Sequence, residues 1–444
     1  MPNLKSEAPA MDRSEALFGQ AREVMPSGYT RHLVVAKPYP RYADYGTGCR
    51  IVDVDGHSTI DFVNNFTALI HGHAKREIVE VIASQAGRLL SAILPTEWEV
   101  RLAELLVERI PGVEQVRFTN TGSEAVMIAV KAARAYTGKP KIAKMEGGYH
   151  GQFDLIEASF QPPPDRWGDS ARPTPVANNA GTPQSLLDEL VLLPLNDIGP
   201  TRARLRSEAS QIAAVIVDPN RLQLGMVEPR PDYLAMLREE TSRLGIVLIF
   251  DEVIALRNSY HGTQGLLGIL PDLTTMGKII GGGMPIGAIG GSLEVMAVFD
   301  VDSGEPKVKH SGTFTANPLS MAAGHTGMSL LTREAFDDLA AKGQRLRDGL
   351  ERVRRDLRII GRVEGRGSMS SLMMTDQPTT NYRELAAVMA SGLLAKTLAY
   401  QKLLMAEGVL SMRGSFIGST PMTNDDIDFT IEAVRRALTK LNAA

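Results

Sequence analysis

Cysteine is almost absent from this chain. Its 444 residues include one cysteine, Cys49, so no disulfide can form within the chain, and cysteine and histidine do not cluster at the spacings of a zinc site. No stretch approaches the ~20 apolar residues that span a membrane, and the first residues lack the basic and apolar segments of a signal peptide. We therefore expect a cytoplasmic protein that binds no metal.

An excess of charge of one sign is also missing. The chain has 48 Lys and Arg against 51 Asp and Glu, a formal net charge of −3, with both signs interspersed. A nucleic-acid binder or a membrane-surface protein would present a basic patch. We therefore expect small-molecule ligands and neither nucleic acid nor membrane as a partner. The length and the 43% hydrophobic composition suffice for two or more domains.

Short apolar runs alternate with longer amphipathic segments through the middle of the chain. We expect strands at 115–119, 141–145, 212–217 and 246–250. These runs are almost continuously apolar, which is typical of strands buried on both faces. The pattern predicts an α/β fold with a mostly parallel sheet and helices on both of its faces.

The two ends of the chain have a different pattern. The sequence "CRIVDVDGHSTIDFV" predicts a hairpin that turns at Asp55-Gly56. After residue 320 come charged helices, short strands and a last helix for which Asn424 is the expected N-cap. We predict an N-terminal arm (1–60) that packs with a smaller α+β domain (321–444), and a large ligand-binding domain between them (61–320).

One lysine stands beside a run of three glycines. The stretch "LTTMGKIIGGGMPIG" (273–287) contains Lys278, and "FDEV" (250–253) places Asp251 at the end of an apolar run. A nucleotide phosphate loop is disfavoured because Asp272 stands where its first glycine is required. A dinucleotide-binding loop is disfavoured because Ile286 replaces its third glycine.

Five segments together resemble a known family. "RFTNTGSEAVMIAVKAARAYTG", "EGGYHG", "FDEV", "PDLTTMGKIIGGGMPIGAIGG" and "HSGTFTANPLSMAAG" follow one another in the order found in class III aminotransferases of fold type I. The resemblance extends from about Glu15 to Leu438. It implies pyridoxal 5′-phosphate as cofactor, an amine donor and an α-keto acid acceptor as substrates, and a homodimer with shared active sites.

The resemblance also implies roles for individual residues. Lys278 would bind the cofactor's aldehyde and move the substrate proton, and Asp251 would keep the ring nitrogen protonated. "NTGSEA" begins a helix, where free N–H groups favour a phosphate. The residues expected to contact the phosphate or the ring are Gly122, Ser123, Tyr149, His150, Val253 and Thr313, the last reaching the neighbouring subunit's phosphate. For His150, the alternative to a cofactor contact is a purely structural role.

Three arginines are candidates for substrate binding. Arg31 and Arg413 match arginines of β-phenylalanine aminotransferases that bind the donor's and the keto acid's carboxylates, and guanidinium groups suit such bidentate contacts. Arg221, in "VDPNRLQLG", stands with Asp218 where many family members have Glu-Pro and then Gln. An extra cation there would stabilise the phenolic oxygen, reshape the donor pocket or point away.

We therefore expect a transaminase that moves an amino group from a β-amino acid or a related amine to pyruvate or 2-oxoglutarate by a ping-pong mechanism. Two alternatives remain. One is a glutamate-1-semialdehyde 2,1-aminomutase, which transfers the amino group within one molecule and lacks an arginine that matches Arg413. The other is an amine:pyruvate transaminase, whose donor needs no carboxylate.

Overall fold

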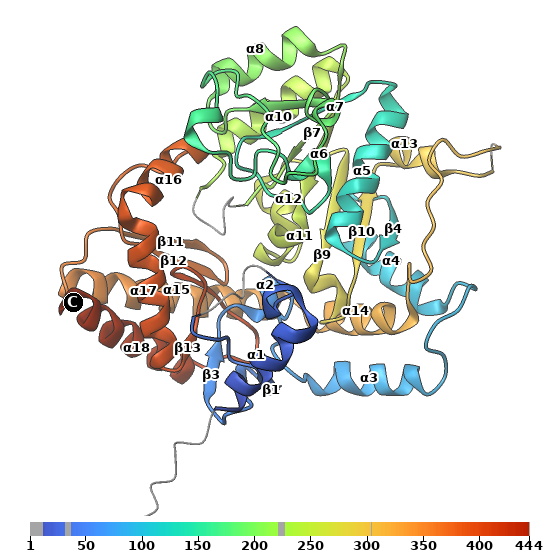
Figure 1. The fold of residues 1–444 in the computed structure, drawn as a ribbon. Helices are drawn as coiled ribbons and strands as arrows, with labels where there is room; N and C mark the ends of the chain where they lie inside the picture. Colours follow the sequence, from blue (N-terminus) through green and yellow to red (C-terminus); the bar gives the residue numbers. More distant parts are fainter. Residues whose placement is uncertain (1–11, 32–36, 221–226, 303, 444) are drawn as a thin grey trace, which may run out of the picture.

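A seven-stranded sheet forms the centre of the molecule. The computed structural model describes residues 12–31, 37–220, 227–302 and 304–443 (Figure 1). The strand order of the sheet is β4-β10-β9-β8-β7-β5-β6. In chain order the strands are β4 (Gln115–Thr119), β5 (Lys141–Met145), β6 (Leu190–Leu193), β7 (Ile212–Val217), β8 (Val247–Asp251), β9 (Leu273–Gly277) and β10 (Gly287–Gly291).

The sheet is mostly parallel, as the sequence predicts. Strands β9, β8, β7, β5 and β6 pair in parallel, whereas β10 is antiparallel to both of its neighbours. The predicted strands at 115–119, 141–145 and 212–217 are confirmed to the residue, and the fourth is shifted by one position to β8. All residues of β7 and β8 are buried. The continuous apolar runs therefore reflect burial on both faces.

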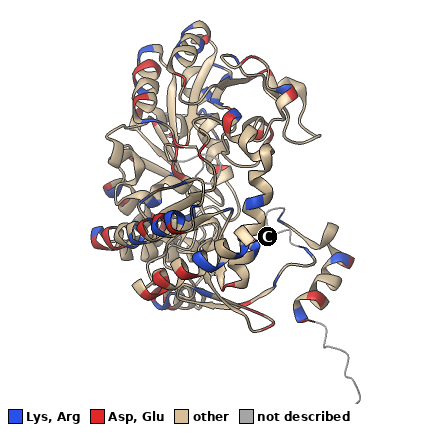
Figure 2. Cartoon of the chain, turned by 90° about the vertical axis from the view of Figure 1, so that its left-hand side faces the viewer, with Lys and Arg blue, Asp and Glu red and all other residues tan. Residues whose placement is uncertain are grey.

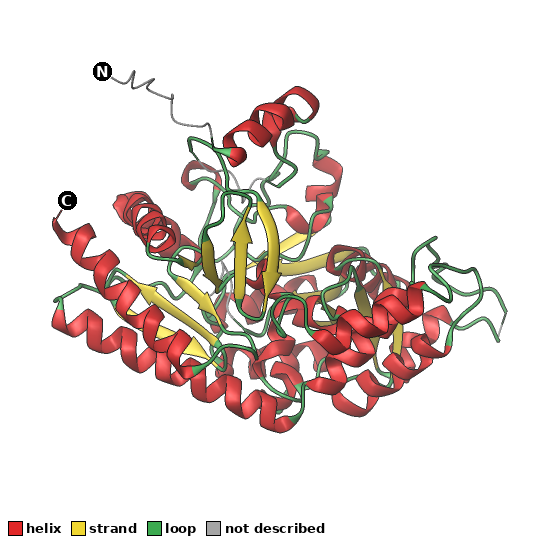
Figure 3. Cartoon of the chain, turned by 90° about the horizontal axis from the view of Figure 1, so that it is seen from below, coloured by secondary structure: helices red, strands yellow, loops and turns green. Residues whose placement is uncertain are grey.

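Helices pack on both faces of this sheet. Figure 3 shows the strands lying among helices. Helix α5 (Gly122–Thr137) packs its apolar side on one face, together with side chains of β5, β7 and β8. Helix α10 (Pro231–Leu244) packs on the other face, where its core also includes residues from the C-terminal segment. The fold is thus the α/β arrangement of fold type I that the sequence predicts, and it brings the carboxyl ends of the parallel strands to one edge.

The N- and C-terminal segments meet in a second sheet. Its strand order is β1-β2-β3-β13, and the C-terminal strand β13 pairs in parallel with β3. These strands are β1 (Ala43–Thr47), β2 (Arg50–Asp53), β3 (Ser58–Asp61) and β13 (Val409–Leu410). The antiparallel pairing of β2 with β3 confirms the predicted hairpin. The proposed division into 1–60, 61–320 and 321–444 stays a prediction.

A third sheet and four helices complete the C-terminal segment. The sheet runs β11 (Arg362–Arg366), β12 (Met369–Met373) and β14 (Ser415–Ile417). The helices are α15 (Arg333–Asp356), α16 (Tyr382–Val388), α17 (Leu394–Ala406) and α18 (Asn424–Ala443). The expected N-cap at Asn424 is wrong, because Thr423 caps α18. Thr423 Oγ1 accepts from the Asp426 N–H at 3.1 Å, and Asp426 accepts from the Thr423 N–H at 3.0 Å.

Smaller helices surround these sheets. Helix α14 (Pro318–Leu330) packs against α3 (Arg76–Ala86), α4 (Glu97–Arg109) and the turn that begins at Lys278. Further helices of the described residues are α1 (Arg13–Val24), α6 (Asp154–Glu157), α7 (Gln184–Leu187), α8 (Ile198–Glu208), α11 (Glu252–Ala255), α12 (Gly262–Leu267) and α13 (Leu293–Met296). Within the described ranges, no helix has both the length and the apolar composition to cross a membrane. Figure 2 shows acidic and basic residues interspersed along the helices.

One turn has an unusual backbone. The four residues of α2 (Asn64–Thr67) all have positive φ angles of 47° to 78°, so this turn is left-handed. A left-handed helical conformation costs roughly 1–2 kcal/mol for each residue with a side chain, and asparagine tolerates it better than most. Contacts from other segments must therefore hold the turn in this form.

Candidate active site

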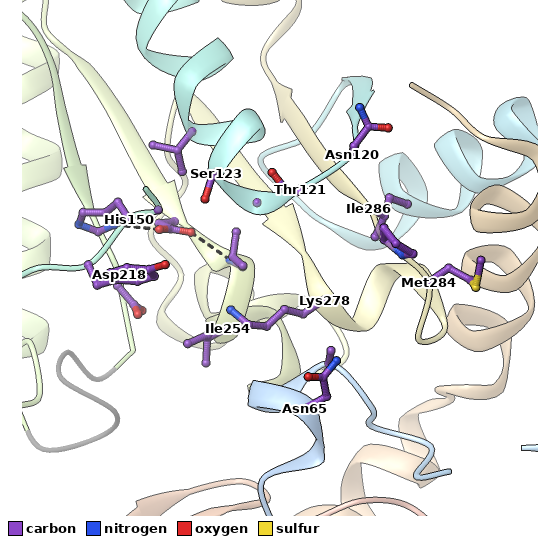
Figure 4. A pocket seen from close by; sticks show the side chains of 18 of the residues that line it. Asn65, Asn120, Thr121, Ser123, His150, Asp218, Ile254, Lys278, Met284 and Ile286 are labelled. Carbon is purple, nitrogen blue, oxygen red and sulfur yellow. Dashed lines mark hydrogen bonds and ion pairs between the residues drawn. The ribbon is translucent and has the colours of Figure 1, made fainter. Parts of the chain in front are cut away.

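A cavity of about 330 Å³ lies at the carboxyl ends of β7, β8 and β9 (Figure 4). Ligands of α/β proteins bind at such an edge. The cavity brings together most of the predicted cofactor residues, namely Gly122, Ser123, Tyr149, His150, Asp251, Val253 and Lys278. Further lining residues are Asn65, Ala68, Asn120, Thr121, Val126, Gly151, Asp218, Ile254, Gly283, Met284, Pro285 and Ile286.

Lys278 enters the cavity from the end of β9. Its side chain is half-buried, and its backbone has a φ of 50°, an uncommon conformation for a residue with a side chain. Burial lowers the pKa of the Lys278 amine, and the charge of the neighbouring Asp251 opposes this effect only in part. The environment therefore favours the neutral amine, which is both a nucleophile and a base.

The glycines after Lys278 mainly allow close packing of the backbone against neighbouring segments. Gly282 has a φ of 58°, and a Cβ there would lie 2.3 Å from the Ala323 carbonyl oxygen of α14. A Cβ on Gly281 would meet Ile286 at 2.5 Å. Gly283 alone of these three lines the cavity among the described residues. The run of glycines thus lets the lysine turn lie directly on α14.

Asp251 ends β8 and is held by three donors. His150 Nδ1 lies 2.8 Å from its Oδ2, and its Oδ1 accepts from Thr275 Oγ1 at 3.0 Å and from the Val253 N–H at 3.2 Å. Burial by itself raises the pKa of the Asp251 carboxyl, but the hydrogen bond from His150 and the other donors bring the net pKa below its usual value. A buried carboxylate is thereby kept ionised.

His150 is the neutral partner of that carboxylate. Its side chain is fully buried, and burial lowers the pKa of the imidazole. The neutral ring must carry its proton on Nδ1 in order to donate to Asp251. Its Nε2 is buried and has no hydrogen-bond partner among the described residues. We infer that His150 orients Asp251. This role is compatible with the position of His150 in the cavity wall, and it is also the kind of structural role that the sequence left open for this residue.

The start of α5 forms one end of the cavity. Thr121 caps the helix by accepting from the Glu124 N–H at 3.1 Å, so the N–H groups of Gly122 and Ser123 at the first turn stay free to bind an anion. Glycine fits closely there, because a Cβ would lie 3.0 Å from the methyl groups of Val253 and would push that side chain aside. The Gly-Ser pair therefore suits a phosphate.

A second carboxyl group faces the cavity from the next strand. Asp218 follows β7 and lies beside Asp251, because Val217 is opposite Phe250 in the parallel pairing. Burial and the neighbouring Asp251 charge raise the pKa of Asp218 well above its usual value. The two carboxyl groups thus differ in state, since Asp251 favours the charged form and Asp218 the neutral form.

Three predicted residues, Thr313, Arg413 and Arg31, are not among the described residues that line the cavity. Thr313 is exposed on a loop whose Gly312 would place a Cβ 3.7 Å from Asn120 Nδ2, at the cavity edge. Arg413 is half-buried, and its neighbour Met412 lines a smaller cavity of about 40 Å³ that shares Ile254 with the larger one. Arg31 is exposed. Arg221 lies outside the described residues.

Sequence reasoning missed two residues of this region. Thr275 holds Asp251 because the pairing of β8 with β9 sets the two residues opposite each other, a register that a parallel-sheet prediction alone does not give. Asn65 lines the cavity, and its Oδ1 accepts from Arg31 Nη1 at 3.0 Å. No motif marks Asn65, since its left-handed turn depends on distant contacts.

These residues fit the cofactor that the family resemblance implies. The N–H groups at the start of α5 suit its phosphate, the ionised Asp251 suits a protonated ring nitrogen, and Lys278 suits its aldehyde. Tyr149 and Val253 line the same cavity and supply aromatic and aliphatic surface for the ring. The cavity therefore offers a suitable group for the phosphate, the ring and the aldehyde of pyridoxal 5′-phosphate.

Comparisons with known proteins agree with this fit. A family model described as aminotransferase class-III matches residues 34–410. The chain is 46% identical to an omega-transaminase from Sphaerobacter thermophilus, with 98% and 99% of the two chains covered and a TM-score of 0.94. It is 34% identical to a β-phenylalanine aminotransferase from Variovorax paradoxus (97% and 94% covered, TM-score 0.85). It is 38% identical to glutamate-1-semialdehyde 2,1-aminomutase 2 of Geobacillus kaustophilus, with 97% and 99% covered.

Proposed function

The chain belongs to the class III aminotransferases, which use pyridoxal 5′-phosphate, and we propose that it moves the amino group of a β-amino acid to an α-keto acid. The observation that carries the proposal is the hydrogen bond of Arg31 to Asn65. It sets a guanidinium group beside a residue that lines the same cavity as Lys278. A donor whose amine reaches Lys278 can then place a carboxylate on Arg31.

The chain's own groups carry the proton transfers. When bound, pyridoxal phosphate supplies an electron-withdrawing ring that acidifies the carbon beside the amino nitrogen and carries the amino group between two half-reactions. With the cofactor and donor bound, Lys278 would be the base that takes the proton from that carbon. Its lowered pKa makes the free amine available for this step. Asp251 holds the proton of the ring nitrogen. The keto acid then accepts the amino group by the same steps in reverse order. Because the first product leaves before the keto acid binds, the kinetics are of the ping-pong type.

We assign the acceptor's carboxylate to Arg413, with pyruvate or 2-oxoglutarate as the acceptor. Arg413 is half-buried beside the smaller cavity, and its burial lowers the pKa of the guanidinium without a nearby acidic partner contributing. Replacing Arg413 with Ala should raise the KM for the keto acid about tenfold or more, because a charge-assisted contact is lost. The donor half-reaction, measured without keto acid, should be unaffected. An unchanged keto-acid KM would remove Arg413 from this role.

We propose that the active form is a homodimer in which Thr313 reaches the partner's phosphate. The loop of Thr313 carries Phe314, which is 62% exposed, and Asn317 donates to the Leu90 carbonyl at 3.1 Å. That second segment also holds Ile93, whose side chain is fully exposed. Exposed apolar side chains gathered beside a cavity edge are typical of an interface. Equilibrium sedimentation should give twice the chain mass, and a monomer that retains full activity would exclude the shared site.

Two alternatives have support of their own. The 38% identity to an aminomutase favours amino transfer within one molecule, a reaction that needs no external keto acid. The 46% identity to an omega-transaminase is the support for an amine as donor. Arg31 separates the amine transaminase from the proposal, because only a carboxylate-bearing donor needs a cation at that place. The aminomutase's substrate also carries a carboxylate, so Arg413 and the need for an external keto acid separate that alternative.

The proposal is tested by mixing the cofactor-loaded protein with excess 3-amino-3-phenylpropanoate in the absence of keto acid. We expect the cofactor's visible absorbance to bleach and a keto product to form. 1-Phenylethylamine, which lacks the carboxylate, serves as the matched donor and should react more slowly. Bleaching by the amine alone would favour an amine transaminase, and bleaching only by 4,5-diaminovalerate would favour an aminomutase.

A further inference from the structure

The amide of Asn65 connects the cavity with Arg31. Asn65 Oδ1 accepts a hydrogen bond from Arg31 Nη1 at 3.0 Å, and Asn65 lines the cavity into which Lys278 points (Figure 4). Resting on the proposed function, we propose that Asn65 is a positioning residue that holds the Arg31 guanidinium at the cavity mouth, so that donors with a carboxylate are selected. It acts through Arg31 and does not itself react.

The Arg31 guanidinium has no other side-chain hydrogen bond within the part of the chain that the structure describes. Among the described residues, Arg31 forms no ion pair with a carboxylate. Its side chain is exposed, so without Asn65 it would sample many rotamers. One hydrogen bond to an amide that projects from a held backbone turn orients the planar fork while it leaves the positive charge for a ligand. A substrate carboxylate is the ligand that such a group binds best.

Asn65 is fixed because its backbone turn is fixed from three directions. Asp61 Oδ1 accepts from the Asn64 N–H at 2.8 Å, and Asn64 Nδ2 donates to the Ile417 carbonyl at 2.6 Å. Arg257, which is fully buried, donates from Nη1 to the Thr67 carbonyl at 3.1 Å. These contacts come from β3, from β14 and from the segment after α11. They hold the left-handed turn and so the place of Asn65.

Asparagine meets two requirements at this position. It tolerates the φ of 47° that the turn imposes, which most other side chains do not. Its amide oxygen accepts from the guanidinium without cancelling the charge, whereas an aspartate would pair with Arg31 and compete with the substrate. The side chain therefore orients Arg31 and leaves it available.

The test uses the cofactor-loaded full-length enzyme and two donors that differ in the carboxylate. Asn65→Gly adopts the left-handed φ freely and removes only the amide. We expect it to raise the KM for 3-amino-3-phenylpropanoate about tenfold, with kcat changed less than about twofold, and to leave the KM for 1-phenylethylamine within about twofold. Asn65→Asp should raise the KM for the carboxylate donor further.

A double-mutant cycle with Arg31→Ala separates positioning from a structural role. If Asn65 acts through Arg31, Asn65→Gly should have no added effect in the Arg31→Ala enzyme. An equal loss with both donors, or multiplied losses in the double variant, would overturn the proposal. Failure of the proposed function looks different, because Arg31→Ala alone would then leave the KM for the carboxylate donor unchanged. If Arg31→Ala raises that KM and Asn65→Gly does not, only the positioning role is lost.

Discussion

Replacing Lys278 with Ala is expected to lower kcat by roughly 10³-fold or more, because one side chain supplies both the covalent bond to the cofactor and the base for proton transfer. The cavity offers no second amine among its lining residues. The variant should also release its cofactor on dialysis, whereas the wild-type enzyme retains it. We would measure turnover with 3-amino-3-phenylpropanoate and pyruvate, and the visible absorbance after dialysis.

Lys144 provides a matched control for this prediction. It is fully buried, and burial lowers its pKa to about 7, so by pKa alone it would also be a competent nucleophile. Its amine, however, donates to the Ile156 and Ala158 carbonyls at 2.6 and 2.8 Å and does not line the cavity. Borohydride reduction of the loaded enzyme should label Lys278 and leave Lys144 unmodified. A label on Lys144, or near-normal turnover of Lys278→Ala, would refute the assignment.

The features that sequence alone predicts well are those that short segments determine. Strands such as 212–217 are recognisable because burial on both faces leaves a continuous apolar run. The grouping of Lys278 with Asp251 follows from motifs that occur in one order along the chain. The N-cap of the last helix shows the limit of such local reasoning. Thr423 and Asn424 are both good caps, and the reciprocal contacts with Asp426 decide for Thr423.

The features that sequence does not predict depend on contacts between distant segments. Asn65 lies in a left-handed turn, a conformation that asparagine tolerates but Phe66 and Thr67 do not favour. The contacts that hold this turn come from Ile417 and Arg257, which are distant in the sequence. The donation of Thr275 to Asp251 depends on strand register. Such contacts need the folded chain, so Asn65 emerged only with the structure.

Replacing Asp251 with Asn should lower kcat roughly 10²- to 10³-fold, the order of loss seen when one preorganised electrostatic group of an active site is removed. The hydrogen bonds from His150 and Thr275 keep this carboxyl ionised despite its burial, and an uncharged amide cannot hold the proton of the ring nitrogen. The measurement is kcat for both half-reactions, together with the pH titration of the cofactor's absorbance.

Asp218 supplies the comparison that makes this result specific, because it faces the same cavity from the neighbouring strand. Burial and the charge of Asp251 favour its protonated form, which an asparagine resembles in both size and charge. Asp218→Asn should therefore change kcat less than about fivefold. Asp251→Asn is the same chemical change on the neighbouring strand, and it should lower kcat at least about a hundredfold. Equal losses of kcat in the two variants would mean that activity depends on the total negative charge of the cavity and not on a carboxylate at the position of Asp251. An Asp251→Asn enzyme with near-normal turnover would show that the ring proton is not held from β8.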